Sequence, residues 1–243
     1  MKFIFLAAGK SKRIFNKIKK NKCLIKIKNK PLIKLLIDEV YKTKITDVSI
    51  ITGFRSGYIK RELKEYKNIK FIYNKKYNTT EMLYSLILGV KSAETDIVIS
   101  YSDILFDHKM INHLIEKKRN NITVPILKNW KKIWKIRNKD PLDDGETLFI
   151  DRSNKLISIG EKIKNLKDIK YQYMGLIFIP KNKIKKILLA YKKISRIKKM
   201  HASSFLNYLI KNKFIIDSII EKKGWYEFDD FEDYRNYKNY FGN

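Results

Sequence analysis

The order of its apolar segments constrains the fold of this chain more than any other feature. Within the first 120 residues, short apolar runs that suit buried strands alternate about four times with amphipathic helical patterns. This alternation is typical of a doubly wound α/β fold, in which ligands bind beyond the carboxyl ends of the parallel strands. The predicted strands are residues 3–7, 47–52, 69–73 and 96–101, and the predicted helices are residues 31–41, 56–66, 81–92 and 107–118.

The second half of the chain is less regular, because a polar, tryptophan-containing segment at residues 128–145 interrupts the alternation. A hairpin is predicted around residues 152–155, where two apolar runs flank turn-forming residues. No linker and no internal repeat divides the chain, so we expect one domain spanning residues 1–243. The other predicted elements are strands at 122–126 and 173–180, helices at 181–193 and 202–211, an extended segment at 214–228 and a short final helix.

Composition excludes several classes of protein. A hydrophobic fraction of 44% with 13% aromatic residues is typical of a folded chain rather than a disordered one. No apolar run approaches the ~18–20 residues that span a bilayer, and residues 1–9 run into a basic segment without a signal-cleavage pattern. The single cysteine, Cys23, excludes an internal disulfide and fits a reducing compartment, so we expect a cytoplasmic protein.

The formal net charge of +29 permits binding of nucleic acid, an anionic membrane or small anions. Most of the 54 basic residues are lysines spread along the whole chain, whereas base readout and bidentate phosphate recognition favour arginine. We therefore interpret most of this charge as a solvated surface, and expect no nucleic acid partner and no membrane insertion. A non-catalytic polyanion-binding protein stays open as an alternative.

The end of the first predicted strand has the character of a phosphate-binding segment. Small residues at 7–9 allow the backbone to approach a ligand closely, and successive N–H groups there can bind phosphates. Lys12, Arg13 and Lys22 follow and can neutralise a triphosphate. The segment lacks the upstream glycine of a Walker A loop, and a tight strand-to-helix connection beside surface lysines is the alternative interpretation.

Two carboxylates are placed where a metal ion could be held. Asp103 comes just after the strand at 96–101, and Mg²⁺ needs one or two carboxylates plus substrate phosphate oxygens. Asp103 could instead cap the next helix, although Asp107 is better spaced for that. Asp229 ends a short strand in an acidic cluster, where Asp230 suits the cap of the final helix. Helix capping and a solvated face are the alternative explanation of this cluster.

Together these segments resemble the sugar-nucleotidyltransferase-like (MobA-like NTP transferase) superfamily, whose strand–loop signature reads Leu-Ala-Ala-Gly-x-Gly-x-Arg with a lysine shortly after. The resemblance is closest to phosphocholine and 2-aminoethylphosphonate cytidylyltransferases, and it rests on residues 74–86, 101–106, 134–146 and 173–176. It implies a Rossmann-like, mostly parallel mixed sheet of the nucleotide-diphospho-sugar transferase type, with a small β or irregular insertion. Residues 1–120 would then form a nucleotide-binding half and residues 121–243 an acceptor-binding half.

The resemblance also implies an activity, namely Mg²⁺-dependent transfer of CMP from CTP to a small phosphorylated or phosphonylated acceptor, with release of pyrophosphate. Phosphocholine and 2-aminoethylphosphonate are examples of such acceptors. A sugar-1-phosphate nucleotidyltransferase using UTP, dTTP or GTP is the alternative within the superfamily. We expect a monomer or a homodimer.

Carried over position by position, the resemblance implies Lys22, Arg13 and Asp103 as catalytic residues, and Asp103 and Asp229 as Mg²⁺ ligands. Two positions depart from the superfamily pattern: Ser11 replaces a glycine, which strains the loop if that position needs a positive φ, and Asn21 replaces a common proline. The implied nucleotide-binding residues are Leu6, Ala7, Ala8, Gly9, Lys12, Arg13, Lys22, Thr52, Gly53, Thr80, Tyr84 and Ser85.

Acceptor recognition is predicted to involve the irregular segment of the second half. Arg137 suits an acceptor phosphate, and Trp130 or Trp134 with nearby acids suits an ammonium group through cation–π contact. Ordinary core tryptophans are the alternative. An acceptor phosphate is already an anion, so no general base is needed, and the histidines are interpreted as surface or structural: His108, His113 and His201. The implied acceptor-binding residues are Trp134, Arg137, Asp144, Glu146 and Tyr173.

Overall fold

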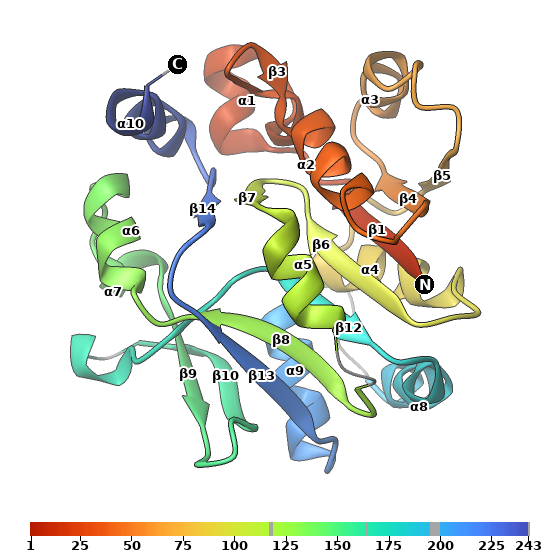
Figure 1. Ribbon diagram of the computed structural model, residues 1–243, viewed down its shortest axis with the longest axis vertical. Helices are drawn as coiled ribbons and strands as arrows, with labels where there is room; N and C mark the ends of the chain where they lie inside the picture. Colours follow the sequence, from red (N-terminus) through yellow and green to blue (C-terminus); the bar gives the residue numbers. More distant parts are fainter. Residues whose placement is uncertain (117–118, 164, 195–199, 243) are drawn as a thin grey trace.

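The centre of the protein is an eight-stranded mixed sheet, seen in a computed structural model that describes residues 1–116, 119–163, 165–194 and 200–242 (Figure 1). The order is β11-β8-β12-β6-β1-β4-β5, and β13 pairs with β8. Pairings β6-β1-β4-β5 and β8-β13 are parallel, whereas β12 and β11 run antiparallel to their neighbours. The strands are β1 (Lys2–Ala7), β4 (Asp47–Thr52), β5 (Ile69–Tyr73), β6 (Ile97–Tyr101), β8 (Ile122–Leu127), β11 (Gln172–Tyr173), β12 (Leu176–Ile179) and β13 (Ile216–Glu221).

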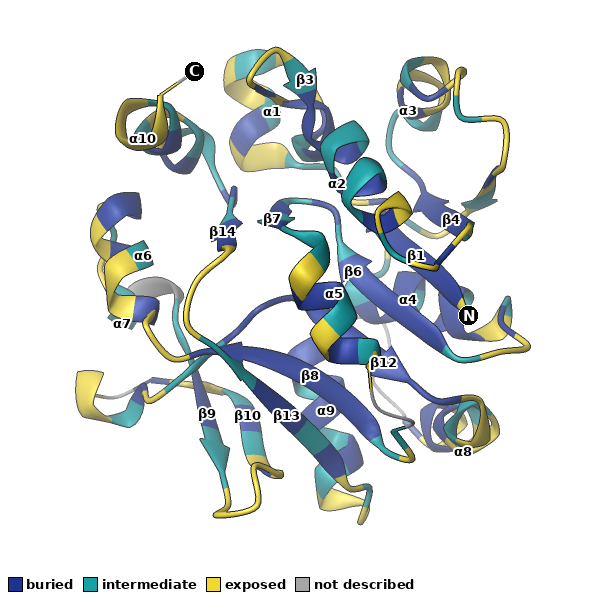
Figure 2. Cartoon of the chain, viewed as in Figure 1, coloured by how far each residue is buried: buried dark blue, intermediate teal, exposed yellow. Residues whose placement is uncertain are grey.

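Helices cover both faces of this sheet, as the alternation of strand and helix predicts. Alternate side chains of β1 enter two different cores: Phe3 and Phe5 pack on one face, and Ile4 and Leu6 pack on the other. Figure 2 shows the central strands buried and the outer surfaces of the helices exposed. The helices are α1 (Lys12–Ile18), α2 (Leu32–Tyr41), α3 (Ser56–Glu62), α4 (Met82–Lys91), α5 (His108–Ile115), α6 (Trp130–Arg137), α7 (Pro141–Asp144), α8 (Lys181–Lys192), α9 (Ala202–Lys211) and α10 (Phe231–Phe241).

The predicted α/β class, with a mostly parallel mixed sheet, is confirmed, but the irregular interpretation of residues 128–145 is wrong. This segment contains α6 and α7. α6 forms because Trp130, Trp134 and Arg137 recur at helical spacing and are all buried, so they make one inward stripe among exposed lysines. The charged face of the helix hides this stripe in the sequence.

Small two-stranded ladders finish the fold. The predicted hairpin is confirmed, and among the described residues no helix has both the length and the apolar character needed to cross a membrane. The ladder of β7 with β14 matters most for function, because it joins the end of β6 to the C-terminal segment (Figure 1). The remaining elements are β2 (Lys26–Ile27), β3 (Lys30–Pro31), β7 (Ile104–Phe106), β9 (Glu146–Ile150), β10 (Leu156–Lys162), β14 (Trp225–Glu227) and the 3₁₀ turns η1 (Lys22–Leu24) and η2 (Leu166–Asp168).

Candidate active site

The segment after β1 reverses at a residue with left-handed backbone geometry. Ser11 has φ 53° and ψ 32°, a region in which glycine is the usual residue. Its side chain provides a compensating contact, because the Ser11 hydroxyl accepts a hydrogen bond of 3.0 Å from the backbone N–H of Lys22. Lys12 and Arg13 then begin α1, so these two cations lie on the first turn of a short helix instead of in a loop.

Lys22 brings the two predicted metal-binding carboxylates together. Its ammonium lies 3.2 Å from Asp103 Oδ2 and 2.7 Å from Asp229 Oδ1. Arg13 Nη1 donates to the second oxygen of Asp229. The side chains of Lys22, Asp103 and Asp229 are largely shielded from solvent, with 14%, 19% and 10% exposure. The convergence of Asp103 and Asp229, which are distant in the sequence, is therefore present in the structure.

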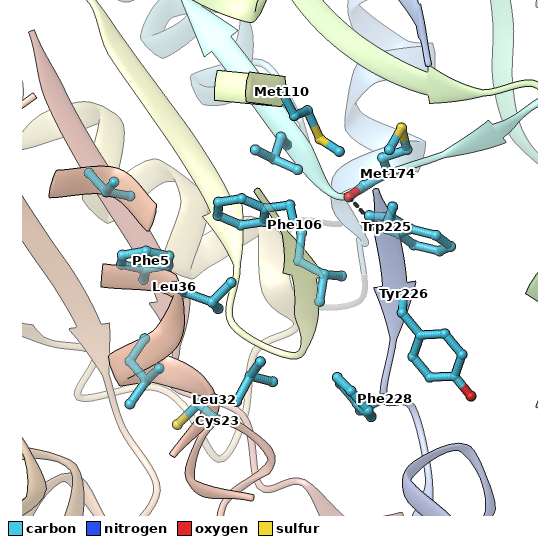
Figure 3. Packing of buried hydrophobic residues seen from close by; sticks show 14 of the residues in the cluster. Phe5, Cys23, Leu32, Leu36, Phe106, Met110, Met174, Trp225, Tyr226 and Phe228 are labelled. Carbon is cyan, nitrogen blue, oxygen red and sulfur yellow. Dashed lines mark hydrogen bonds between the residues drawn. The ribbon is translucent and has the colours of Figure 1, made fainter. Parts of the chain in front are cut away.

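The ladder of β7 with β14 explains this convergence. Asp103 stands between β6 and β7, and Ile104 pairs with Glu227 across the ladder. The carbonyl of Asp103 accepts a hydrogen bond of 2.8 Å from the N–H of Phe228, the residue before Asp229. Figure 3 shows Trp225 and Tyr226 of β14, and Phe228 just after this strand, in the apolar cluster next to this junction.

A cavity of about 530 Å³ opens at the carboxyl ends of β1 and β6, and these acids and cations line it. Most of the predicted nucleotide-binding positions line it as well, together with residues outside the predicted set of site residues. The predicted residues on its wall are Leu6, Ala7, Ala8, Gly9, Lys12, Arg13, Lys22, Thr80, Ser85, Asp103 and Asp229. The additional residues are Lys10, Ser11, Asn21, Cys23, Asn74, Tyr77, Asn78, Glu81, Met82, Tyr101, Ser102, His201 and Glu227.

Three predicted nucleotide-binding residues do not line the cavity. Thr52 is fully buried, and its hydroxyl accepts a hydrogen bond from Ser56. A Cβ atom on Gly53 would lie 2.6 Å from Tyr77 Cβ and 2.7 Å from the Ala8 carbonyl oxygen, so this glycine allows close packing behind the site. Tyr84 is not on the cavity wall either, and the Lys76 ammonium lies 5.6 Å from the centre of its ring.

Two of the predicted acceptor-binding residues lie behind the cavity wall, which corrects the expectation that they face a ligand. The Arg137 side chain is fully buried and donates to Asp233 through Nε at 2.9 Å and Nη2 at 3.1 Å. Trp134 is 3% exposed, and its ring lies 4.9 Å from the Arg137 guanidinium carbon. Their physical role is packing and charge pairing, because no ligand can reach a covered guanidinium without displacing its partners.

Glu146 and Tyr173, two other predicted acceptor residues, are not among the described residues that line the cavity. Glu146 accepts a hydrogen bond of 2.9 Å from the Ser203 hydroxyl. Tyr173 packs edge-on against Tyr101, which is on the cavity wall, with ring centroids 5.9 Å apart. Burial raises the pKa of both tyrosines, so both stay neutral at physiological pH. Asp144 ends α7, and its side chain lies outside the described residues.

The charges of Lys22, Asp103 and Asp229 stabilise one another. Burial by itself would lower the pKa of Lys22, but Asp103 and Asp229 outweigh it and hold this pKa above its ordinary value. Burial would raise the pKa of Asp229, but Lys22 and Arg13 outweigh it and hold this pKa below its ordinary value. Lys22 and Asp229 are therefore both charged throughout the neutral range.

The histidines divide into two groups. His108 and His113 form surface pairs with Glu39 and Glu221, as the structural interpretation requires. His201 is exposed, as the surface interpretation requires, but it also lies on the cavity wall just before α9. The local sequence around His201 does not predict this position, because the position depends on where α9 packs in the fold.

The fold and this site define the class of the protein. Residues 3–157 match the MobA-like NTP transferase domain, so the chain belongs to this family and is a nucleotidyltransferase. Its relatives include the Campylobacter jejuni CTP:phosphoglutamine cytidylyltransferase, which is 28% identical over 94% of this chain and 96% of the relative. The Streptococcus pneumoniae choline-phosphate cytidylyltransferase is 32% identical over 47% of this chain and 50% of that protein.

Solved structures support the same fold. A CTP:phosphocholine cytidylyltransferase from S. pneumoniae superimposes with a TM-score of 0.77 at 20% identity, covering 99% of this chain and 98% of that one. An inositol-1-phosphate CTP transferase from T. maritima gives a TM-score of 0.77 at 18% identity, over 96% of this chain and 90% of that one.

Proposed function

We propose that this nucleotidyltransferase transfers CMP from CTP to a small phosphorylated or phosphonylated acceptor, with Mg²⁺ as cofactor and pyrophosphate as the second product. The proposal rests on the convergence of Asp103, Asp229 and Lys22 on the wall of the cavity. The preference for CTP rests on the two curated relatives, which are both cytidylyltransferases.

The charges on the cavity wall favour a divalent cation. The chain as a whole has 54 basic and 25 acidic residues, yet the described lining has as many acids as strong cations. A bound triphosphate adds about four negative charges, so the loaded site needs further positive charge. The acids are Glu81, Asp103, Glu227 and Asp229, and the cations are Lys10, Lys12, Arg13 and Lys22.

The donor chemistry of the site fits Mg²⁺. Among the described residues, no three or more His, Cys, Asp or Glu side chains form a cluster that could hold a metal ion. Mg²⁺ does not require one, because it commonly binds one or two carboxylates together with substrate phosphate oxygens and water. Asp103 and Asp229 are the residues that would hold it, and the bound ion supplies charge neutralisation of the phosphates.

The residues of the chain then have distinct tasks. The backbone at Ala8 and Gly9 lies open to the cavity, and a Cβ atom on Gly9 would meet nothing within 4 Å. This open backbone can approach the phosphates of CTP closely. Lys22 and Arg13 offer ammonium and guanidinium donors to the α-phosphate, where negative charge increases during transfer. An acceptor oxygen attacks the α-phosphorus while the bond to pyrophosphate breaks.

No proton acceptor is needed for this reaction. A phosphate or phosphonate oxygen is already anionic near neutral pH, so it attacks without transferring a proton to the protein. The task of the site is therefore to bring two anions together in the right geometry and to neutralise their charge. His201 lies on the cavity wall and is a contact for the acceptor in this proposal.

The acceptor class follows from the relatives and from the wall of the cavity. The relatives act on phosphoglutamine and on choline phosphate, so we propose an acceptor with a phosphate group and a second, nitrogen-containing group. Tyr101, Glu227 and His201 lie on the wall of the cavity, and the last two come from the second half of the chain. An aromatic face and a carboxylate suit a nitrogen-bearing group.

A substrate screen tests the proposal directly. CTP, UTP, dTTP and GTP are each incubated with phosphoglutamine, phosphocholine, 2-aminoethylphosphonate and glucose 1-phosphate, and pyrophosphate release is measured with and without Mg²⁺. We expect release with CTP and an amine-bearing or amide-bearing acceptor. Release with a sugar phosphate and another nucleotide would instead identify the sister activity within the family.

A variant separates catalysis from simple binding of polyanions. Asp103→Asn should abolish pyrophosphate release while circular dichroism and the thermal midpoint remain close to those of the wild type. A polyanion-binding protein would release no pyrophosphate, would bind DNA or heparin with an affinity that falls steeply with salt, and would keep that binding in the Asp103→Ala variant.

A further inference from the structure

The first turn of α10 contains a buried carboxylate with more hydrogen-bond donors than a helix cap requires. Asp233 is fully buried and accepts from Arg137 Nε and Nη2 at 2.9 and 3.1 Å and from Lys139 Nζ at 2.9 Å. It also accepts from the backbone N–H of Asp229 at 2.8 Å and of Asp230 at 3.2 Å. Only the contact with Asp230 belongs to the capping box of this helix.

Another helix of the protein shows what a cap alone looks like. Asp107 caps α5 by accepting from the backbone N–H groups of Lys109 and Met110, and none of the described residues pairs a buried cation with it. We call the start of α10 (Asp229, Asp230 and Asp233, with Arg137 and Lys139) the α10 corner. This corner instead buries the Asp233 carboxylate against the Arg137 guanidinium. Burying ions is costly unless the geometry is good, so such a pair is a weak device for stability alone. The extra donors therefore call for another explanation.

The corner is connected directly to the proposed transfer site. Asp233 holds the backbone N–H of Asp229, whose own carboxylate contacts Lys22 and Arg13 in the cavity. Phe228, between Glu227 and Asp229, is fully buried. Side chains on either side of it consequently face the cavity, and the backbone that carries them is fixed from behind.

Arg137 connects the same corner to a second cavity residue. Its Nη1 lies 3.4 Å from Glu227 Oε2, while its Nε and Nη2 lie on Asp233. One buried guanidinium thus contacts the residue two positions before Asp229 and the residue four positions after it. These contacts on both sides of Asp229 restrict the conformation of its backbone.

We propose that Asp233, held by Arg137, is a positioning residue that sets the orientation of the Asp229 carboxylate relative to Asp103 and Lys22. Asp233 does not touch substrate and acts through the backbone of Asp229. The inference rests on the proposed function, because orientation matters only if Asp229 takes part in nucleotidyl transfer. It also gives Arg137 a task different from the acceptor contact that its sequence context suggests.

Asp233→Asn is the main test. Asparagine can accept from the backbone N–H groups or face the cations, but it cannot pair their charge. We expect kcat for pyrophosphate release to fall about 100-fold, the effect of a reacting group displaced by roughly an ångström. The KM for the acceptor should change much less, because Asp233 itself does not line the cavity. Mn²⁺ affinity should also weaken, measured by electron paramagnetic resonance with a non-hydrolysable CTP analogue.

Asp107→Asn is the matched control, since it removes a helix-capping carboxylate that does not line the cavity. It should lower the thermal midpoint slightly and leave kcat and Mn²⁺ affinity unchanged. A purely structural Asp233 predicts the same pattern for Asp233→Asn, with kcat per folded molecule at the wild-type value. That result overturns the inference while leaving the proposed function intact.

Arg137→Lys covers the case in which Asp233→Asn does not fold. Lysine keeps the positive charge but loses the two-pronged contact with Asp233. It should retain more activity than Arg137→Met and still show a lower kcat than the wild type. An Arg137→Lys enzyme with wild-type kcat and Mn²⁺ affinity would also overturn the inference. Absence of CTP-dependent pyrophosphate release in the wild type is a different outcome, which defeats the proposed function itself.

Discussion

The turn that begins α1 and the corner that begins α10 reach the same carboxylate, Asp229, but their charges have opposite environments. The Arg13 side chain at the first is 63% exposed, whereas Arg137 and Asp233 at the second are fully covered. An exposed cation can leave its partner for a ligand at little cost. A buried pair cannot, because separating it leaves an uncompensated charge away from water.

With these two environments, one site can be both accessible to a ligand and fixed in shape. Arg13, in the first half of the chain, is exposed on the cavity wall and available to phosphates. Ion pairs of the second half hold the backbone from behind. We therefore expect substitutions in the first region to affect chiefly activity, and substitutions in the second to affect stability and, through Asp229, activity.

Replacing Lys22 should have the largest effect on activity. Lys22→Met removes the cation between Asp103 and Asp229 and should lower kcat for pyrophosphate release about 100- to 1000-fold, as the loss of one preorganised charge does in other enzymes. Steady-state kinetics with saturating CTP and Mg²⁺ measures this. Lys44→Met, at an exposed lysine that is not on the cavity wall, is the control and should keep wild-type kcat. Equal rates for both variants would remove Lys22 from the mechanism.

Replacing Arg137 should have the largest effect on stability. Arg137→Met leaves Asp233 buried without its main partner, and the free energy of unfolding should fall by about 3–5 kcal/mol. Urea denaturation measures this loss. Arg235→Met breaks a pair with Glu232 whose side chains are 58% and 51% exposed, and should cost only about 0–1 kcal/mol. Similar losses for the two variants would show that burial does not distinguish these pairs.

Acid should weaken the α10 corner. Burial opposes ionisation of Asp230, but Lys139 and backbone N–H groups outweigh it, so its pKa lies below the ordinary value of 3.8. A carboxylate with a lowered folded-state pKa stabilises the protein above 3.8, and this contribution is lost as the pH falls through the folded-state pKa. Thermal midpoints between pH 7 and pH 3 should therefore be level and then drop below about pH 4. The Asp230→Asn variant should lose less over the same acid range, and an equal loss would contradict this assignment.

The strained turn at Ser11 should show the smallest effect. Ser11→Gly relieves a left-handed residue but removes the hydrogen bond to the Lys22 N–H, and these opposing terms should leave the free energy of unfolding within about 1 kcal/mol of wild type. Ser11→Ala keeps the strain and loses the bond, so it should cost about 1 kcal/mol more than glycine does. Chemical denaturation of both variants measures the difference, and greater stability of the alanine variant would contradict the strain.

Some of the candidate site could be predicted from the sequence because it consists of local patterns. The strand ending in small residues at 7–9, followed by Lys12 and Arg13, is contiguous, and its place at the cavity follows from the strand it ends. Asp103 could be predicted in the same way, since a carboxylate just after a buried strand lies at the rim of the sheet. His201 and Glu227 had no such local signal.

Burial of charged residues was the feature that the sequence could not reveal. Arg137 in a lysine-rich segment has the appearance of a solvent-facing ligand for phosphate, yet Asp233 and Glu227 cover it. Trp134 contacts this guanidinium and lies in the core for the same reason. The partners that cover both side chains come from the C-terminal segment, nearly one hundred positions later.

By itself, the sequence determined the α/β class, the order of most strands and helices, and the phosphate-binding character of the segment after β1, because each depends on side-chain pattern within a few residues. Only the tertiary structure decided that Asp229 meets Asp103, and which charges face the cavity and which lie behind it. These depend on the ladder of β7 with β14 and on the docking of α10 against α6. Such long-range packing determines which charged groups are exposed to ligand and which are removed from water.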